Sequence, residues 1–420
     1  MTTAFPNLAT GPPVERPVQQ VVEAVRVPHI TLHAFCDTAD MAGIIENALA
    51  DRRMSRAHAT VHSGGIAAAL TLYSQTASPN LVIIECKEAT ALHSQLDELA
   101  SICQPSTKVV VIGYVNDVSL YRELIIQGIS EYIVAPVSSI SIVVAICRLY
   151  EDAAATKLGR TFAFVGAKGG AGSSTIANNV ASTVGRFTGR DVVLAELDLP
   201  FGSASLDFNL DPLQGIVQAI EDPERLDDVL LERLLTKCDE HLSILTAPAT
   251  LAQCYDLTED AVVRVIELAQ ANVPFVAIDV PHIWTSWAKK TLLMADEVVI
   301  TAVPDLANLR NARHLVDLLK QARPNDTPPK VVLNQVGMAK RSEIEPAKFV
   351  DALGLPMSAC IPFEPATFSS AANKGKMIAD VSPNSAICAS FVKVAQALTG
   401  STPLKADWRS KFNFASLWRA

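Results

Sequence analysis

The chain has 420 residues, of which 49% are hydrophobic and 19% charged, and its formal net charge is −9 at pH 7. This length exceeds what one ordinary hydrophobic core supports, so two or three domains are expected. The acidic balance argues against nucleic acid as a partner, because phosphates demand a basic protein surface.

The eight cysteines form no C-x-x-C pair and lie mostly in apolar runs. That usage is typical of reduced cysteines that serve as small hydrophobic side chains. We find no signal-peptide pattern and no uncharged apolar run of the roughly 18 residues that cross a bilayer. The sequence therefore predicts a soluble, cytoplasmic protein.

Residues 1–27 are proline-rich and lack periodicity, which predicts a disordered arm. In residues 28–150, short apolar runs alternate with helical patterns. The expected strands are 29–35, 80–85, 108–112 and 131–134, and the expected helices are 41–50, 92–102, 118–127 and 139–150. This alternation predicts a doubly wound parallel sheet.

Residues 151–160 form an expected linker, and a second α/β domain is expected over 161–400. Its expected strands are 161–165, 191–197, 242–245, 274–279, 297–303, 330–334 and 357–361, with helices such as 260–269 and 309–322 between them. The predicted fold class is therefore α/β with two doubly wound parallel-sheet domains. Residues 401–420 follow as an amphipathic tail.

The stretch from Phe162 to Thr175 is a strand, a glycine-rich turn and a helix start, which is the context that a phosphate-binding loop requires. Glycines let the backbone approach a phosphate closely, and the helix start offers free N–H groups to an anion. Ser174 occupies the hydroxyl position that would bind Mg²⁺ in such a loop. The sequence therefore predicts that ATP and Mg²⁺ bind here.

Two further strands end in acids. The strand that ends at Asp279 would place a carboxylate beside the loop, and Glu196 and Asp198 would share a face at the end of another strand. Asp198 could orient an attacking water. Alone, Asp279 would more often be a helix cap or a solvated strand end, and Asp198 could be a turn residue before Pro200, but ligands of open α/β sheets bind at these strand ends.

The loop resembles the deviant Walker A motif of the ParA/MinD ATPases, K-G-G-x-G-K-T/S-T. The matching residues are Lys168, Gly169, Gly170, Ala171, Gly172, Ser173, Ser174 and Thr175. The longer stretches 198–209, 280–289, 331–338 and 361–373 resemble the TadZ/CpaE family of Flp-type pilus assembly proteins. The resemblance covers residues 28–400.

The resemblance implies a role for each matching residue. Lys168 would be the signature lysine that reaches the partner's nucleotide in a sandwich homodimer, and Asp198 the switch I aspartate of catalysis. Ser174 and Asp279 would hold Mg²⁺. Asn334 would read adenine, with the region of Pro362 closing over the base.

The chain departs from this class at Ser173, where the class has the lysine that binds its own phosphate. Losing a charged hydrogen bond costs about 1.5–3 kcal/mol, which is about ten- to a hundredfold in affinity. We therefore expect ATP binding that stabilises a dimer, with slow or absent hydrolysis.

The first domain resembles a response-regulator receiver that has lost its chemistry. Glu85 stands at the phosphoacceptor position, Gly113 replaces the hydroxyl residue and Ala135 replaces the lysine. We expect an interaction module for a polar landmark protein or for pilus or tad secretion components. Glu85 could mimic a phosphorylated aspartate or be a plain strand-end glutamate.

In the tail, Leu404, Trp408, Phe412, Ala415 and Trp418 fall on one helical face. MinD carries a C-terminal amphipathic membrane helix, so peripheral membrane contact is one interpretation. A tail that packs on the second domain or stays disordered is the other.

The resemblance as a whole implies a factor that localises at a cell pole and assembles a Flp-type (type IVb) pilus. The alternative is an actively cycling ParA/MinD-type positioning ATPase that acts on membrane or DNA. A bacterial tyrosine kinase is a third class, but the C-terminus has no tyrosine cluster. Ser173 favours the first interpretation, because a cycling ATPase should retain the missing lysine.

Overall fold

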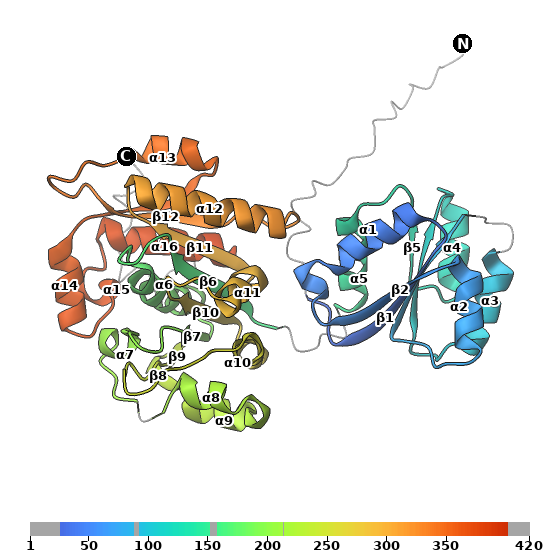
Figure 1. The fold of residues 1–420 in the computed structure, drawn as a ribbon, viewed down its shortest axis with the longest axis horizontal. Helices are drawn as coiled ribbons and strands as arrows, with labels where there is room; N and C mark the ends of the chain where they lie inside the picture. Colours follow the sequence, from blue (N-terminus) through green and yellow to red (C-terminus); the bar gives the residue numbers. More distant parts are fainter. Residues whose placement is uncertain (1–25, 88–91, 152–157, 213, 402–420) are drawn as a thin grey trace, which may run out of the picture. The chain divides into compact units, whose positions relative to one another are not determined.

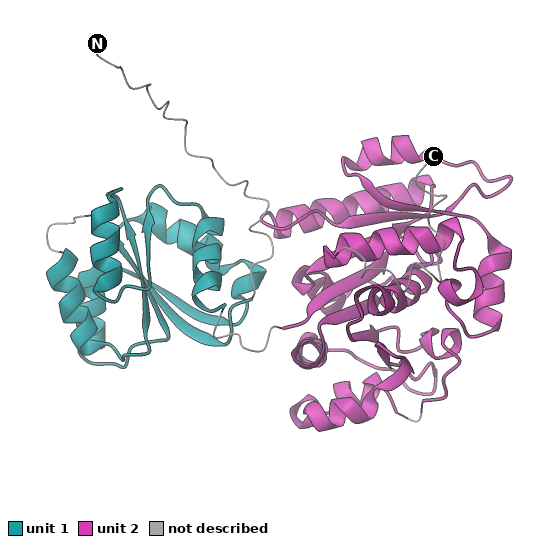
Figure 2. Cartoon of the chain, turned by 180° about the vertical axis from the view of Figure 1, so that it is seen from behind, with its two compact units in different colours: residues 1–153 teal, residues 154–420 magenta. Residues whose placement is uncertain are grey.

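The computed structural model describes residues 26–87, 92–151, 158–212 and 214–401, and the chain divides into two compact units, residues 1–153 and 154–420 (Figure 2). The tail expected at 401–420 lies outside the described residues except for Ser401, as does the arm up to residue 25. None of the described helices is long and apolar enough to span a bilayer.

Unit 1 is a five-stranded parallel sheet in the order β2-β1-β3-β4-β5. Figure 1 labels three of its strands, β1, β2 and β5, and its helices. The order is that of flavodoxin-like folds, which confirms the expected fold class. Its strands are β1 Ile30–Cys36, β2 Ala57–Ser63, β3 Leu81–Cys86, β4 Lys108–Gly113 and β5 Glu131–Val134. Its helices are α1 Ala39–Leu49, α2 Gly65–Tyr73, α3 Leu92–Ile102, α4 Val118–Ile126 and α5 Ser139–Leu149.

Two elements of unit 1, β2 and α2, were not among those expected. β2 is an edge strand with the sequence AHATVHS, and none of its residues is fully buried. A buried strand is recognised in a sequence by a continuous apolar run, and β2 has no such run. The packed part of the unit also begins before residue 28, because Arg26 and Val27 are buried and the Val27 N–H donates to the Arg53 carbonyl at 3.0 Å.

Unit 2 is an eight-stranded sheet in the order β13-β12-β11-β6-β10-β7-β9-β8, in which only the β8–β9 pair is antiparallel. Its strands are β6 Arg160–Gly166, β7 Val192–Glu196, β8 Thr236–Asp239, β9 Leu242–Leu245, β10 Phe275–Val280, β11 Glu297–Ala302, β12 Lys330–Val336 and β13 Met357–Pro362. The sequence did not predict β8, a polar edge strand of four residues. Arg160 belongs to β6 rather than to the expected linker.

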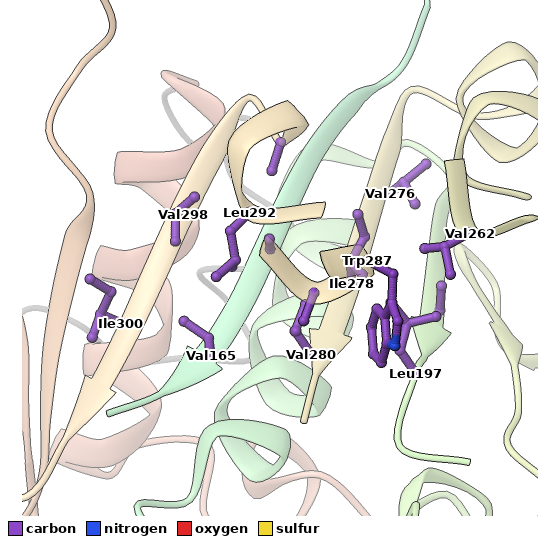
Figure 3. Packing of buried hydrophobic residues seen from close by; sticks show 14 of the residues in the cluster. Val165, Leu197, Val262, Val276, Ile278, Val280, Trp287, Leu292, Val298 and Ile300 are labelled. Atoms are coloured by element: carbon purple, nitrogen blue, oxygen red, sulfur yellow. The ribbon is translucent and has the colours of Figure 1, made fainter. Parts of the chain in front are cut away.

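Helices cover both faces of this sheet, which gives it two hydrophobic cores. The longer helices are α6 Ser173–Thr188, α10 Glu259–Asn272, α11 Ser286–Met294, α12 Leu306–Ala322, α14 Pro365–Asn373 and α16 Ala386–Thr399. The shorter ones are α7 Ala204–Asp207, α8 Ile216–Glu221, α9 Asp228–Leu234, α13 Pro346–Leu353 and α15 Ile378–Val381. One core packs α10, α11, α12 and α13 on the sheet, and the other packs α6 and α16. Figure 3 shows part of the first, including Trp287 with the strand residues Ile278 and Val280.

The central strand β6 lies between β10 and β11. The chain leaves β6 for β7 on one side of the sheet and later leaves β10 for β11 on the other. The crevice at the carboxyl end of β6 is therefore a topological switch point, the place where open α/β sheets bind ligands.

Candidate nucleotide site

The glycine-rich loop joins the end of β6 at Gly166 to the start of α6 at Ser173. Gly170 and Gly172 have φ of +80° and +88°, a backbone conformation that glycine adopts without strain. A Cβ on Gly172 would also lie 2.5 Å from the Asn334 side-chain nitrogen. The shape of the turn therefore requires glycine at positions 170 and 172.

Side chains and backbone from the neighbouring elements fix the loop. The Ala167 N–H donates to the Thr301 carbonyl at 2.8 Å, and Asn311 on α12 donates to the Ala167 carbonyl at 2.9 Å. Asn334 on β12 donates to the Ala171 carbonyl at 2.9 Å. The loop is thus held open before any ligand arrives, with its free N–H groups at the start of α6.

A cavity of about 810 Å³ lies against this loop. The structure brings Lys168, Gly169, Gly170, Ala171, Gly172, Ser173, Ser174, Thr175 and Asp198 together in its lining. The remaining walls are Gly166, Leu197, residues 199–201, 251 and 253–257, together with residues 280–283, Thr285 and Trp287. Lys168 itself is exposed.

Asp279 lies in β10, is 2% exposed and is not among the residues that line the cavity. Burial and the carboxylates of Glu196 and Asp198 raise its pKa to about 7, although a hydrogen bond from the Ser174 side chain works in the opposite direction. Within the described residues, Asp279 Oδ1 and Ser173 Oγ are buried without a hydrogen-bond partner. An unpaired buried polar atom costs free energy, so a ligand that pairs with these two atoms would stabilise the site.

These groups fit a magnesium nucleotide. Mg²⁺ prefers oxygen ligands and is held by one or two protein groups plus phosphates and water; Ser174 and Asp279 supply such oxygens. The part of the chain that the structure describes holds no cluster of three or more His, Cys, Asp or Glu side chains that would bind a metal on its own. A metal here would therefore depend on the phosphates of its nucleotide.

The two acids at the end of β7 do different things. Glu196 is 1% exposed and accepts the N–H groups of Ala204 at 2.8 Å and Ala247 at 3.0 Å. Burial raises its pKa. Asp198, beyond the end of the strand, lines the cavity and accepts the Phe201 N–H at 3.2 Å. The shared face expected for this pair does not form a shared site, since only Asp198 reaches the cavity.

Asn334 and Pro362 do not line this cavity. Asn334 is 7% exposed and its amide is engaged with the loop and with the Gln335 N–H at 2.9 Å. Pro362 ends β13 beside Val336 of β12. Their expected roles at the adenine remain predictions.

Sequence reasoning gave no role to His282, although it quoted the segment that contains it. Its Nδ1 lies 2.9 Å from the Gly166 carbonyl oxygen, and the residue is among those that line the cavity. The signal was its place three residues after Asp279, on the loop that leaves β10.

In unit 1, Glu85 at the end of β3 is 0% exposed. It accepts the N–H groups of Asp37 at 2.7 Å and Thr38 at 2.8 Å, and the Tyr114 hydroxyl at 2.7 Å. A Cβ on Gly113 would lie 2.2 Å from the Tyr132 hydroxyl oxygen.

Ala135 follows β5, where its N–H donates to the Gly113 carbonyl at 2.7 Å. Of the three positions at which a receiver carries its reactive groups, Glu85 is therefore engaged in internal hydrogen bonds, and Gly113 and Ala135 have no polar side chain.

No family model matches the chain. Curated relatives include the septum site-determining protein MinD of Helicobacter pylori, 25% identical over 259 residues, which cover 59% of this chain and 94% of that protein. The match to MinD of Bacillus subtilis, 23% identical over 181 residues, covers 43% of this chain and 66% of that protein's length, just under two thirds.

Solved structures with similarity include a ParA family ATPase from Chlorobium tepidum TLS, 26% identical with a TM-score of 0.51, which covers 57% of this chain and 98% of that one. Another is a pilus assembly protein CpaE from Caulobacter crescentus CB15, 46% identical with a TM-score of 0.30, which covers 30% of this chain and 97% of that one.

Proposed function

We propose that this chain, whose second unit has the ParA/MinD-type P-loop fold, is a nucleotide-dependent localisation and assembly factor for a Flp-type (type IVb) pilus or tad secretion machinery. It binds Mg·ATP and dimerises in response, and it hydrolyses the nucleotide slowly or not at all.

The observation that carries the nucleotide part is the pair of buried, unpartnered oxygens of Ser173 and Asp279 beside a preformed glycine loop. Ser174 and Asp279 would hold the magnesium, and the loop N–H groups would hold the phosphates. Asp198 would orient the attacking water. Hydrolysis would be slow because position 173 supplies no lysine to the phosphates. Asn334 and the Pro362 region would bind the adenine.

Dimerisation is supported by apolar side chains around the cavity. Phe201 and Leu251 are each 71% exposed, and Trp284 is 56% exposed on the loop after β10. Large exposed apolar groups that adjoin a site mark an interaction surface. A second copy that covers them would bring its exposed Lys168 to the nucleotide.

The pilus part rests on the sequence stretches 198–209, 280–289, 331–338 and 361–373, and the 46% sequence identity with the pilus assembly protein of C. crescentus points in the same direction. Unit 1 would then be the module that docks on pilus or tad secretion components or on a polar landmark. Its Glu85, enclosed by its own hydrogen bonds, suits docking rather than phosphotransfer.

The test is the mass of the full chain in solution with and without Mg·ATP, measured by light scattering. We expect a dimer with Mg·ATP that is lost in Lys168→Ala and kept in Lys393→Ala, whose exposed lysine lies on α16 away from the cavity. An ATP-dependent dimer that is unchanged in Lys168→Ala would refute the role of this lysine in the partner's site. Rapid turnover stimulated by DNA or liposomes would favour the cycling positioning ATPase instead.

A further inference from the structure

His282 is attached to the glycine-rich loop by a single, directed hydrogen bond. Its Nδ1 lies 2.9 Å from the Gly166 carbonyl oxygen. Because a carbonyl only accepts, the hydrogen of this bond must sit on Nδ1. The Nε2 atom is therefore the ring nitrogen left for a ligand.

A tight turn fixes the backbone at His282. The Ile283 N–H donates to the Pro281 carbonyl at 2.7 Å, which makes His282 the central residue of a three-residue turn. Pro281 restricts the chain just before it. His282 thus follows β10 at a defined turn, and it is one of the residues that line the cavity.

The cavity has few basic groups to offer a triphosphate. Among the described residues that line it, Lys168 and His282 carry the only basic side chains, whereas Asp198 and Asp256 are acidic. Lys168 is exposed and is the side chain expected to reach across a dimer. His282 is consequently the basic group that is tied to its own phosphate loop.

We propose that His282 is a ligand of the terminal phosphate, which takes over in the same chain part of the role of the lysine that Ser173 does not provide. This inference rests on the proposed ATP binding. The cavity extends from the loop toward Asp198 and the segment after β10 and does not include Asn334. His282 therefore meets the end of the phosphate chain that lies farthest from the expected base.

The proposal gives the segment after β10 a means of sensing the nucleotide. The contact requires a ring with a proton on each nitrogen: Nδ1–H stays on the Gly166 carbonyl, and Nε2–H donates to a terminal phosphate oxygen. ADP lacks that phosphate and leaves Nε2 without its ligand. The next two residues, Ile283 and Trp284, are 47% and 56% exposed, so the histidine would place this apolar surface according to which nucleotide is bound.

The test compares Mg·ATP and Mg·ADP affinities of the full chain by calorimetry, with His282→Asn as the main variant. The asparagine amide can keep a donor near the Nδ1 position but does not extend to Nε2. A charged hydrogen bond is worth about ten- to a hundredfold in affinity, so we expect Mg·ATP binding to weaken by that factor and Mg·ADP binding to change less than about twofold. His314→Asn, at an exposed position on α12 outside the cavity lining, is the matched control.

An unchanged ratio of ATP to ADP affinity in His282→Asn would overturn the proposal. If both affinities fell equally, the side chain would only hold the loop. A second readout is the Nε2 resonance of His282 in ¹⁵N-labelled wild-type protein, which should shift with Mg·ATP and not with Mg·ADP. A wild-type chain that binds neither nucleotide would overturn the proposed function, and this inference with it. Normal wild-type binding with no effect of His282→Asn would overturn this inference alone.

Discussion

Each unit has a buried carboxylate on an inner strand of its sheet, Glu85 in unit 1 and Asp279 in unit 2. The two carboxylates differ in how many hydrogen bonds they accept. Burial works to raise the pKa of Glu85, yet hydrogen bonds from Tyr114, Thr38 and Asp37 outweigh it and lower the pKa. Burial raises the pKa of Asp279 to about 7, and within the described residues its Oδ1 has no partner. One site is complete without a ligand, and the other is arranged for one.

The largest expected effect comes from breaking the complete site with Glu85→Ala. The variant leaves the N–H groups of Asp37 and Thr38 and the hydroxyls of Thr38 and Tyr114 without their acceptor. Each buried donor that is left without its acceptor costs about 1–3 kcal/mol, and several are orphaned together here. All four tryptophans lie after residue 153, so tryptophan fluorescence does not report on unit 1. The unfolding of unit 1 in urea is measured as the transition that is seen only by far-UV circular dichroism.

The control is Glu85→Gln, which keeps the shape and one acceptor oxygen and should cost less. The pH dependence has a definite sign. The pKa of Glu85 is lower in the folded chain than the ordinary value of 4.5, so its contribution is present above 4.5 and is lost as the pH falls through the folded pKa. A stability of unit 1 that is equal in the wild type and Glu85→Ala at neutral pH would contradict the assignment.

The open site should respond in the opposite way. The pKa of Asp279 rises from 3.8 to about 7 in the folded chain, so ligand-free unit 2 loses stability as the pH rises between these values. The upper limit of this loss is about 4 kcal/mol. Asp279→Asn should therefore stabilise the ligand-free protein at pH 8, as measured by tryptophan fluorescence in urea, while abolishing stabilisation by Mg·ATP.

Asp305→Asn is a suitable control for the loss of a single carboxylate. This side chain caps α12 and the hydrogen bonds that it accepts from Asn308 help to lower its pKa against the effect of burial. Its substitution should destabilise the ligand-free chain rather than stabilise it. An Asp279→Asn chain that is less stable than the wild type at pH 8 would show that Asp279 is not strained without its ligand.

The sequence predicted the glycine loop, Asp198 and Asp279 because strand-end acids and closely spaced glycines are local signals. It also predicted both doubly wound sheets from their buried apolar strands. It missed β2 and β8, since edge strands such as Ala57–Ser63 carry polar residues and show no apolar run.

Contacts across the fold were beyond the sequence. No spacing in the sequence shows that Glu196 accepts hydrogen bonds from the N–H groups of Ala204 and Ala247. Nor does any spacing show that His282 hydrogen-bonds to a carbonyl 116 residues earlier in the chain. These pairings depend on how the strands are ordered in the sheet. The residues that hold the site together were therefore harder to predict than the residues that line it.

Restoring the missing lysine would sharpen the comparison, because it fills the open site from within the chain. Ser173→Lys should place a cation at the first residue of α6, where the ParA/MinD motif has one. We expect Mg·ATP to bind about ten- to a hundredfold more tightly in calorimetry, which is the worth of a charged hydrogen bond. Ser173→Met introduces a side chain of similar length to lysine but without its charge, and it should not tighten Mg·ATP binding. Equal gains in affinity in both variants would attribute the effect to packing.

The smallest expected effect is that of Tyr114→Phe, which removes one donor from the complete site. Tyr114 donates to Glu85 at 2.7 Å and is 45% exposed, and the same carboxylate oxygen still accepts from the Thr38 hydroxyl at 2.8 Å. Because this acceptor keeps a partner, the variant should cost unit 1 only about 1 kcal/mol. The hydrogen bond to Glu85 also raises the pKa of Tyr114 to about 12; in Glu85→Gln that pKa should fall, which an alkaline absorbance titration would detect. A loss in Tyr114→Phe as large as that of Glu85→Ala would mean that the site depends on the tyrosine, and that unit 1 is less completely closed by its own backbone than Asp37 and Thr38 suggest.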